Sequence, residues 1–225
     1  MKNFYFLLLI FIGGCTPPVV FEQPYPTDKP NLAGIPQEYQ GAFICESDSS
    51  LVIIAERDIT VHKSHYFRTQ LSRVDQRDDC RIENDKMYIA GREECIPLSI
   101  VSDSVVQGVF HEVDTLFVMS SKSVARYYEG HLVISQELQT VEWAVSLLSR
   151  QLGGDVTYRA ITDKTSIKEV KRITQATDIT RSTDKKPRYR VKPTMREFED
   201  LLKSQKVFVE CEYLQKVVLE EQLKG

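Results

Sequence analysis

Residues 51–70, LVIIAERDITVHKSHYFRTQ, decide the fold. Their two apolar runs, 51–55 and 59–70, are separated by the polar triplet Glu56-Arg57-Asp58. β-branched and aromatic residues favour strands, and short polar clusters between such runs favour turns. The pattern predicts two antiparallel strands joined by a tight turn.

The same alternation of short apolar runs and turn residues extends from residue 37 to about residue 135. Clusters of Asp, Ser and Asn at residues 48–50, 83–85 and 102–104 predict further turns. The predicted strands span residues 42–46, 51–55, 59–70, 86–90, 94–101, 105–112, 115–120, 123–128 and 131–135. Regular spacing of this kind favours an antiparallel β-sandwich or a barrel-like meander.

Residues 136–152 fit two patterns. Apolar residues at spacings of three and four favour a helix, whereas a period-two alternation around Trp143 favours a strand. Gly153-Gly154-Asp155 then leads directly into the strand-like run 156–160, as in a hairpin. We predict the hairpin.

Two short helices are predicted toward the C-terminus. Ser166 followed by Glu169, and Thr194 followed by Glu197, are capping-box patterns. A last strand is predicted at residues 206–214, followed by a polar helix or a frayed end at residues 215–225. The chain is therefore expected to be mainly β to α+β.

The first fifteen residues, MKNFYFLLLIFIGGC, form a separate signal. A short basic start precedes nine apolar or aromatic residues, and Gly13-Gly14 follows before Cys15. A membrane-spanning helix needs about 20 apolar residues, so this run is too short to span. Its order of charge, apolar run and small residues is typical of a secretory signal peptide.

Ile12-Gly13-Gly14-Cys15 also resembles the lipobox of bacterial lipoproteins. The resemblance implies cleavage before Cys15, diacylglycerol on its thiol and often an acylated amino terminus. Two acyl chains give stable membrane anchoring. Because Thr16 is not the aspartate that retains many lipoproteins in the inner membrane, the resemblance favours the outer membrane, facing the periplasm. The alternative is an ordinary signal peptide followed by a chance cysteine.

Residues 16–36 hold six of the nine prolines. Proline favours extended polyproline II at about 3.1 Å per residue, so a semi-rigid tether of up to roughly 60 Å is expected. The predicted organisation has four parts: a signal peptide (1–14), a lipidated cysteine and tether (15–36), a β-rich region (37–135), and a hairpin with short helices and a final strand packed on that region (136–225).

Composition and charge are those of an ordinary globular protein. The chain is 42% hydrophobic and 27% charged, with a net charge of −3, which implies no general attraction to nucleic acid. Cys45, Cys80, Cys95 and Cys211 leave open either one disulfide or none, and Cys80 with Cys95 would be the nearest pair in sequence. With no CxxC pair, zinc is disfavoured.

Motifs for catalysis and cofactors are not found. His62 and His65 are placed on a strand, where residues i and i+3 face opposite sides. His111 and His131 are isolated. The acidic residues in 75–85 are interleaved with basic ones, which favours a solvated loop over a calcium site. GxSxG and HExxH are missing, and no catalytic residue, metal or cofactor is predicted.

The most unusual surface is expected at residues 171–192, which carry eight basic residues against two aspartates. Guanidinium groups suit phosphates and carboxylates. An anionic envelope component or an acidic protein could dock there, although a solvated loop is the competing interpretation. The candidate binding residues are Arg181, Lys185, Lys186, Arg188, Tyr189 and Arg190.

The sequence thus predicts a lipid-anchored cell-envelope protein with a β-rich binding or structural module and no evident catalytic activity. The layout, with IPQEYQGAF after the tether, is similar to uncharacterised β-rich bacterial lipoproteins. Two alternatives remain: an envelope hydrolase with dispersed catalytic residues, and a protective lipoprotein that neutralises an incoming effector. The expected partner is the membrane, through the lipid anchor, and no nucleic acid is expected.

Overall fold

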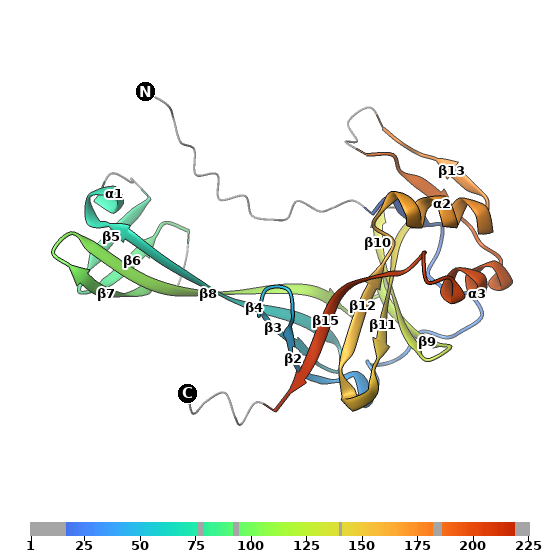
Figure 1. Ribbon diagram of the computed structural model, residues 1–225, viewed down its shortest axis with the longest axis horizontal. Coiled ribbons are helices and arrows are strands. Elements are labelled where there is room, and N and C mark those ends of the chain that lie inside the picture. Colours follow the sequence, from blue (N-terminus) through green and yellow to red (C-terminus); the bar gives the residue numbers. More distant parts are fainter. Residues whose placement is uncertain (1–16, 76–78, 92–94, 140, 182–185, 219–225) are drawn as a thin grey trace. The chain divides into compact units, whose positions relative to one another are not determined.

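The computed structural model describes residues 17–75, 79–91, 95–139, 141–181 and 186–218. Over these residues the chain forms fifteen strands and three short α-helices, so the predicted mainly-β to α+β class is confirmed. The chain divides into two compact units (Figure 1). Unit 1 holds residues up to Gly34, Met119–Leu152 and Val156–Tyr213, and unit 2 holds Ile35–Val118, Gly153–Asp155 and the residues from Leu214 onward.

Unit 1 is built around one central strand, β11. The unit contains strands β1 (Val19–Phe21), β9 (Ser123–Tyr128), β10 (His131–Gln139), β11 (Glu142–Arg150), β12 (Val156–Ala160), β13 (Ala176–Asp178), β14 (Tyr189–Val191) and most of β15 (Val209–Val217). One edge of β11 pairs antiparallel with β10, which pairs with β9. The other edge pairs with β1 and β12. Beyond β1 come β14, which is parallel to it, and then β13, which is antiparallel to β14.

The predicted hairpin at residues 136–160 is confirmed. Strands β11 and β12 pair antiparallel, and the register brings Arg150 opposite Val156. The short 3-10 turn η2 (Leu152–Gly154) connects them, and Gly153 adopts a φ of 90° there. A side chain at that φ would be strained, so the double glycine permits the turn.

Two helices pack in unit 1. Helix α3 (Met195–Lys203) begins as predicted, because Thr194 and Glu197 form a complete capping box. Helix α2 (Lys164–Ile173) begins earlier than predicted. Its N-cap is Asp163, whose carboxylate accepts a 2.6 Å hydrogen bond from the backbone N–H of Ser166. Ser166 lies inside the helix, so the capping box predicted there is wrong.

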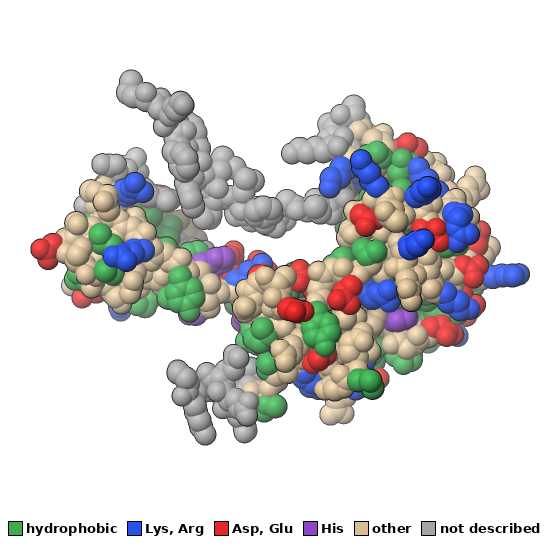
Figure 2. Space-filling model, in the orientation of Figure 1, with side chains coloured by type: hydrophobic (Ala, Val, Ile, Leu, Met, Phe, Trp, Pro, Cys, Tyr) green, Lys and Arg blue, Asp and Glu red, His purple; other side chains and the backbone are tan. Residues whose placement is uncertain are grey.

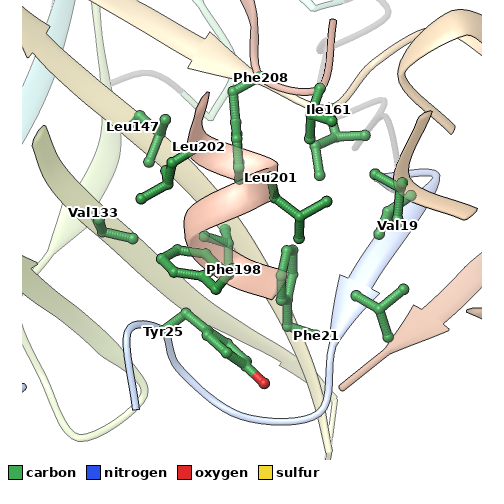
Figure 3. Close-up of a cluster of buried hydrophobic side chains, with 14 of the residues drawn as sticks. Val19, Phe21, Tyr25, Val133, Leu147, Ile161, Phe198, Leu201, Leu202 and Phe208 are labelled. Carbon is green, nitrogen blue, oxygen red and sulfur yellow. The ribbon is translucent and has the colours of Figure 1, made fainter. Parts of the chain in front are cut away.

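The unit 1 core forms where α3 meets the sheet (Figure 3). The ring of Phe198 from α3 lies 4.9 Å from that of Tyr25, and Tyr25 lies 5.2 Å from Phe21 of β1. Leu201 and Phe208 complete this fully buried group. Each such side chain contributes about 1.5–3 kcal/mol when fully buried. The N-terminal segment therefore supplies part of the core.

This finding corrects the predicted tether. Residues 19–35 do not form an extended stalk, because Val19, Phe21, Tyr25 and Ile35 are almost completely buried. Arg126 of β9 also fastens the segment, donating hydrogen bonds to the carbonyl oxygens of Pro24 and Pro26 at 2.8 and 2.7 Å. The prolines lie in a folded loop. Cys15 and the signal peptide lie outside the described residues.

Unit 2 consists of a sheet with two long central strands. Its elements are η1 (Gln37–Tyr39), β2 (Gly41–Cys45), β3 (Leu51–Ile54), β4 (Asp58–Gln70), α1 (Leu71–Asp75), β5 (Cys80–Glu83), β6 (Lys86–Ile89), β7 (Ile96–Ser102), β8 (Val105–Val118) and the end of β15. The strand order is β15-β2-β3-β4-β8-β7-β6-β5, and the pairs are antiparallel. The predicted β3–β4 hairpin is confirmed.

The β4–β8 ribbon carries a small core of its own at one end. Val74, Met87, Ile96, Leu98 and Val106 are buried there, with Phe67 and Phe110 packed against them. We call this part of unit 2, with α1 and β5–β7, the ribbon tip. The β5–β6 hairpin turns at Asn84 and Asp85, which have φ values of 50° and 58°, as the predicted turn requires.

Several predictions differ from the structure. The predicted boundary near residue 135 is wrong, because the units divide at Val118 and β9 and β10 belong to unit 1. The strands predicted at 105–112 and 115–120 are one strand, β8. Strands β1, β5, β13 and β14 and helix α1 were not predicted. The last strand begins and ends later than expected, at Val209 and Val217. No disulfide joins Cys45, Cys80, Cys95 and Cys211.

Candidate anion-binding site

A buried ion pair joins the predicted basic segment to strand β11. Arg188 donates a 2.9 Å hydrogen bond from Nη2 to Oε2 of Glu142, at the start of β11. The two side chains are only 5% and 4% exposed. Burying a carboxylate is costly unless a cation compensates it, so Arg188 is part of the fold.

Two more guanidinium groups surround the same carboxylate. Arg190 Nη2 lies 3.3 Å and Arg181 Nη2 lies 3.8 Å from Oε1 of Glu142. These two side chains are partly open to solvent, with 29% and 53% of their surfaces exposed. Arg181 also donates a 2.7 Å hydrogen bond to Oε1 of Gln139. We call Arg181, Arg188, Arg190 and Glu142 the arginine cluster.

The cluster carries more N–H donors than its one carboxylate can satisfy. Each guanidinium brings five N–H donors, whereas a carboxylate offers about four acceptor positions. The buried Nε atoms of Arg188 and Arg190 have no hydrogen-bond acceptor among the described residues. N–H donors of this kind suit the oxygen atoms of an anion.

Local sequence places the cluster at one end of the β13–β14 pair. Arg188 and Arg190 flank Tyr189, so they project to the same side of the strand and Tyr189 to the other. The loop ends are fixed to each other, since Ile179 N–H donates to the carbonyl of Arg188 at 2.9 Å. Asp178 accepts from Thr180 N–H at 2.8 Å, a short-range turn that begins the loop.

The structure separates the predicted binding residues into different environments. Arg181 and Lys186 are exposed, Arg190 and Tyr189 are half-buried, and Lys185 lies outside the described residues. Tyr189 carries the ammonium group of Lys171 at 3.5 Å from its ring centroid. Arg188 departs most from expectation, because it is buried and paired instead of lying in a solvated loop. Binding by these residues stays a prediction.

Glu142 was missed from the sequence. It is an acidic residue at the edge of the apolar strand 143–148, and it is 3% exposed. A carboxylate beside a buried strand signals a nearby cation. Its partners are 46 and 48 residues away, however, and only the β1–β14 and β1–β11 pairings bring them together.

Histidines of unit 2 make separate contacts. The Nε2 atom of His65 lies 3.1 Å from Glu112, whereas His62 contacts Thr60 at 3.1 Å. Among the described residues, no group of three or more His, Cys, Asp or Glu side chains is placed to hold a metal. The HxxH motif therefore consists of two separate contacts. Within the acidic segment 75–85, Asp75 ends α1 and Cys80–Glu83 form β5, whereas residues 76–78 lie outside the described residues.

Unit 2 carries a groove of 630 Å³ on the face formed by β4, β8 and β7. Its lining includes Tyr66, which is 82% exposed, together with Arg68, Gln107 and His111. Beside it, Ser64 and His111 make a 3.0 Å contact between Oγ and Nδ1. A hydrolase would also need an acid that orients the histidine. The neighbouring Glu112 contacts His65 instead.

Comparison with known proteins gives no relative: no family model, curated protein or solved structure matches the chain. In the described part of the chain, no helix has the length and apolar character needed to cross a membrane. Function must therefore be argued from the residues themselves.

Proposed function

We propose that this chain is a lipid-anchored cell-envelope protein whose β-rich body serves as a binding or structural module. The observation that carries the proposal is Ile12-Gly13-Gly14-Cys15 at the end of a nine-residue apolar run. Small residues before a cysteine at this place are the recognition pattern of lipoprotein processing.

The position of the core supports this proposal. Strand β1 starts at Val19, so a chain processed to begin at Cys15 would keep all of the buried residues described above. Only Thr16, Pro17 and Pro18 would separate the lipidated cysteine from β1. The body would then lie directly at the membrane, not at the end of a stalk. Thr16 favours the outer membrane, facing the periplasm.

The test is metabolic labelling of bacteria that express the full chain with a clickable fatty acid. The wild type should carry the label, should begin at Cys15 by mass spectrometry and should sediment with outer membranes in a sucrose gradient. Cys15→Ala should remove both the label and the membrane association, whereas the matched change Cys95→Ser should alter neither. An unlabelled wild-type protein would overturn the proposal.

A further inference from the structure

The middle of the β4–β8 ribbon consists of two strands (Figure 1). Strand β3 pairs with β4 at Ile59–His62, and β7 pairs with β8 no further than Gly108. Beyond Gly108, in the described part of the chain, β8 pairs only with β4. An edge strand presents a row of N–H and C=O groups to which another strand can pair. This edge of β8 is therefore open to a further strand.

Backbone alternation identifies the groups on the open edge. Leu98 of β7 donates its N–H to the β5–β6 turn, away from β8. Because N–H directions alternate along a strand, the next residue, Ser99, faces β8, where it lies opposite Gln107. By the same alternation, His111 and Val113 direct their N–H and C=O groups to the edge that lies away from β4. Among the described residues, these groups have no hydrogen-bonding partner on that side.

Pro97 accounts for the end of the β7–β8 pairing. It precedes Leu98, which lies opposite Gly108. Proline has no N–H to donate to a β-ladder, so the pairing is interrupted there. Ile96 and Pro97 themselves pair with β6. Strand β7 therefore leaves the edge of β8 before it reaches His111.

The groove described above lies where the open edge begins. Pro97, Val109 and His111 line the groove, so alternate side chains of an added strand would enter it. Tyr66 and Arg68 line the same groove. In the described part of the chain, the Tyr66 hydroxyl and the Arg68 guanidinium make no hydrogen bond or ion pair. In Figure 2, hydrophobic and histidine side chains lie at the surface along this ribbon.

The charges around the groove favour an acidic occupant. Its described lining residues include Arg68 and no aspartate or glutamate. Glu112 and Asp114 of β8 alternate with His111, so they project from the opposite face of the ribbon. Glu112 contacts Nε2 of His65 there at 3.1 Å. A carboxylate on an added strand would therefore supply the acceptor that Arg68 lacks.

We infer that the open edge of β8 binds an extended acidic peptide of a partner protein. The peptide adds as a strand beside His111 and Val113 and directs a carboxylate to Arg68. Backbone hydrogen bonds supply the affinity of strand addition, and side-chain pockets supply its specificity. Tyr66 and Val113, which are 82% and 57% exposed, offer the peptide apolar surface. The inference rests on the binding module of the proposed function and not on its lipid anchor, which the labelling of Cys15 tests separately.

The probe is a fluorescent peptide of alternating valine and threonine with one central glutamate. It is titrated with full-length protein in a neutral detergent, and fluorescence anisotropy should show saturable binding. The analogue with glutamine in place of glutamate should bind at least about tenfold more weakly. Two further analogues carry N-methyl groups on alternate residues, one analogue for each edge of the peptide. Only the analogue methylated on the edge that faces β8 should lose binding, since only that edge donates hydrogen bonds to β8.

Changes in the protein test the same contacts. Arg68→Gln should weaken binding of the glutamate peptide at least about tenfold. Arg73→Gln, at an exposed arginine of α1 outside the groove, should bind like the wild type. Val113→Pro removes an N–H from the open edge and should weaken binding, whereas Val113→Ala keeps that N–H and controls for the lost side chain. If the proline variant fails to fold in a urea titration, the methylated peptides test the edge without any change in the protein.

Other results overturn the inference. No saturable binding, or equal binding by the parent peptide and both methylated analogues, would exclude strand addition. Equal affinity for the glutamine peptide, or an unchanged affinity of Arg68→Gln, would remove the role of charge. Binding of a labelled N-acetylglucosamine oligomer without binding of the peptide would identify a saccharide site instead. A protein lipidated at Cys15 that binds no peptide overturns this site alone, whereas a peptide-binding protein without lipid overturns the anchor alone.

Discussion

Arg126 on β9 donates a 2.8 Å hydrogen bond from Nε to the side-chain oxygen of Asn31, 95 residues earlier in the chain. The same guanidinium holds the carbonyl groups of Pro24 and Pro26. Burial lowers the pKa of Arg126, and the charge of Asp28 partly opposes that shift. One side chain thus fixes the proline-rich segment onto unit 1.

Arg126→Ala should therefore lower the free energy of unfolding by about 3 kcal/mol, because it removes charge-assisted hydrogen bonds to three acceptors. Arg126→Lys should cost less than alanine but should not restore the wild type, since one ammonium cannot reproduce the planar fork. Urea titrations of the full chain measure both values. Limited proteolysis should also cut residues 22–34 faster in the alanine variant. Equal midpoints would show that the segment is held by its apolar residues alone.

The Glu142–Arg188 pair gives a second prediction. Glu142→Ala leaves a buried guanidinium without its carboxylate, so the free energy of unfolding should fall by about 3–5 kcal/mol. Adding Arg188→Met should recover part of that loss, because the uncompensated charge is then gone. A double-mutant cycle from denaturant curves measures the coupling. Additive losses would mean that the two side chains do not interact.

Gly108 on β8 leaves no room for a side chain. A Cβ atom there would lie 2.8 Å from the ring of Phe67 and 3.0 Å from the carbonyl oxygen of Pro97. Gly108→Ala should destabilise the protein by about 1–3 kcal/mol through overpacking. Adding Phe67→Leu removes the ring contact and should lessen that effect. Thermal unfolding of the four proteins tests this, and an alanine variant as stable as wild type would contradict it.

Asp163 should give helix α2 a pH-dependent stability. The hydrogen bond from the backbone N–H of Ser166 lowers the pKa of Asp163 below its usual value. A lowered pKa means that the stabilisation is present above the unfolded-state pKa, about 3.9, and is lost as pH falls through the folded value. Asp163→Ala should cost about 1 kcal/mol near pH 7 and progressively less below about pH 4.

Asp163→Asn is the matched control for this prediction, because it keeps a capping oxygen that does not titrate. The stability difference between wild type and each variant, measured from pH 2 to 7, separates capping from charge. A difference for the alanine variant that stays constant down to pH 2 would refute the titration.

The capping box of α3 gives a further prediction about stability. Thr194 Oγ1 accepts a hydrogen bond from the N–H of Glu197 at 3.3 Å, and Glu197 accepts one from the N–H of Thr194 at 2.7 Å. Thr194→Ala should lower stability by about 1 kcal/mol, whereas Thr194→Ser should keep the cap. Urea midpoints decide the matter, and an unchanged midpoint for the alanine variant would show that the cap contributes nothing.

Local sequence patterns predicted most strands, because the alternation that identifies a strand depends only on neighbouring residues. Alternation places every second side chain on one face, so a run such as 59–70 identifies a strand without its partner. The Thr194 cap was predictable for the same reason. The unit boundary was not, because β9 and β10 read as continuing the β run, and only pairing with β11 assigns them to unit 1.

The tether was predicted wrongly because the prolines received more weight than the apolar residues between them. Six prolines favoured an extended stalk, but Val19, Phe21, Tyr25 and Ile35 supply apolar side chains at intervals that a solvated linker does not need. Weighing those residues would have indicated a folded segment. The arginine cluster was half-predicted, since its basic residues were visible in the sequence. The carboxylate that holds them was not, because strand order decides that contact.

The long β4–β8 ribbon affects how unit 2 unfolds locally. The ribbon tip has its own buried cluster, against which Phe67 packs, whereas between His62 and Tyr66 every side chain of β4 is at least partly exposed. The buried side chains of β4 therefore end before the ribbon tip begins. Between these two buried regions, the backbone hydrogen bonds of the β-ladder hold β4 and β8 together. Regions joined by so few apolar contacts open as separate cooperative blocks. Amides of β5–β7 should therefore exchange with deuterium together, and at lower free energy than those of β2 and β3.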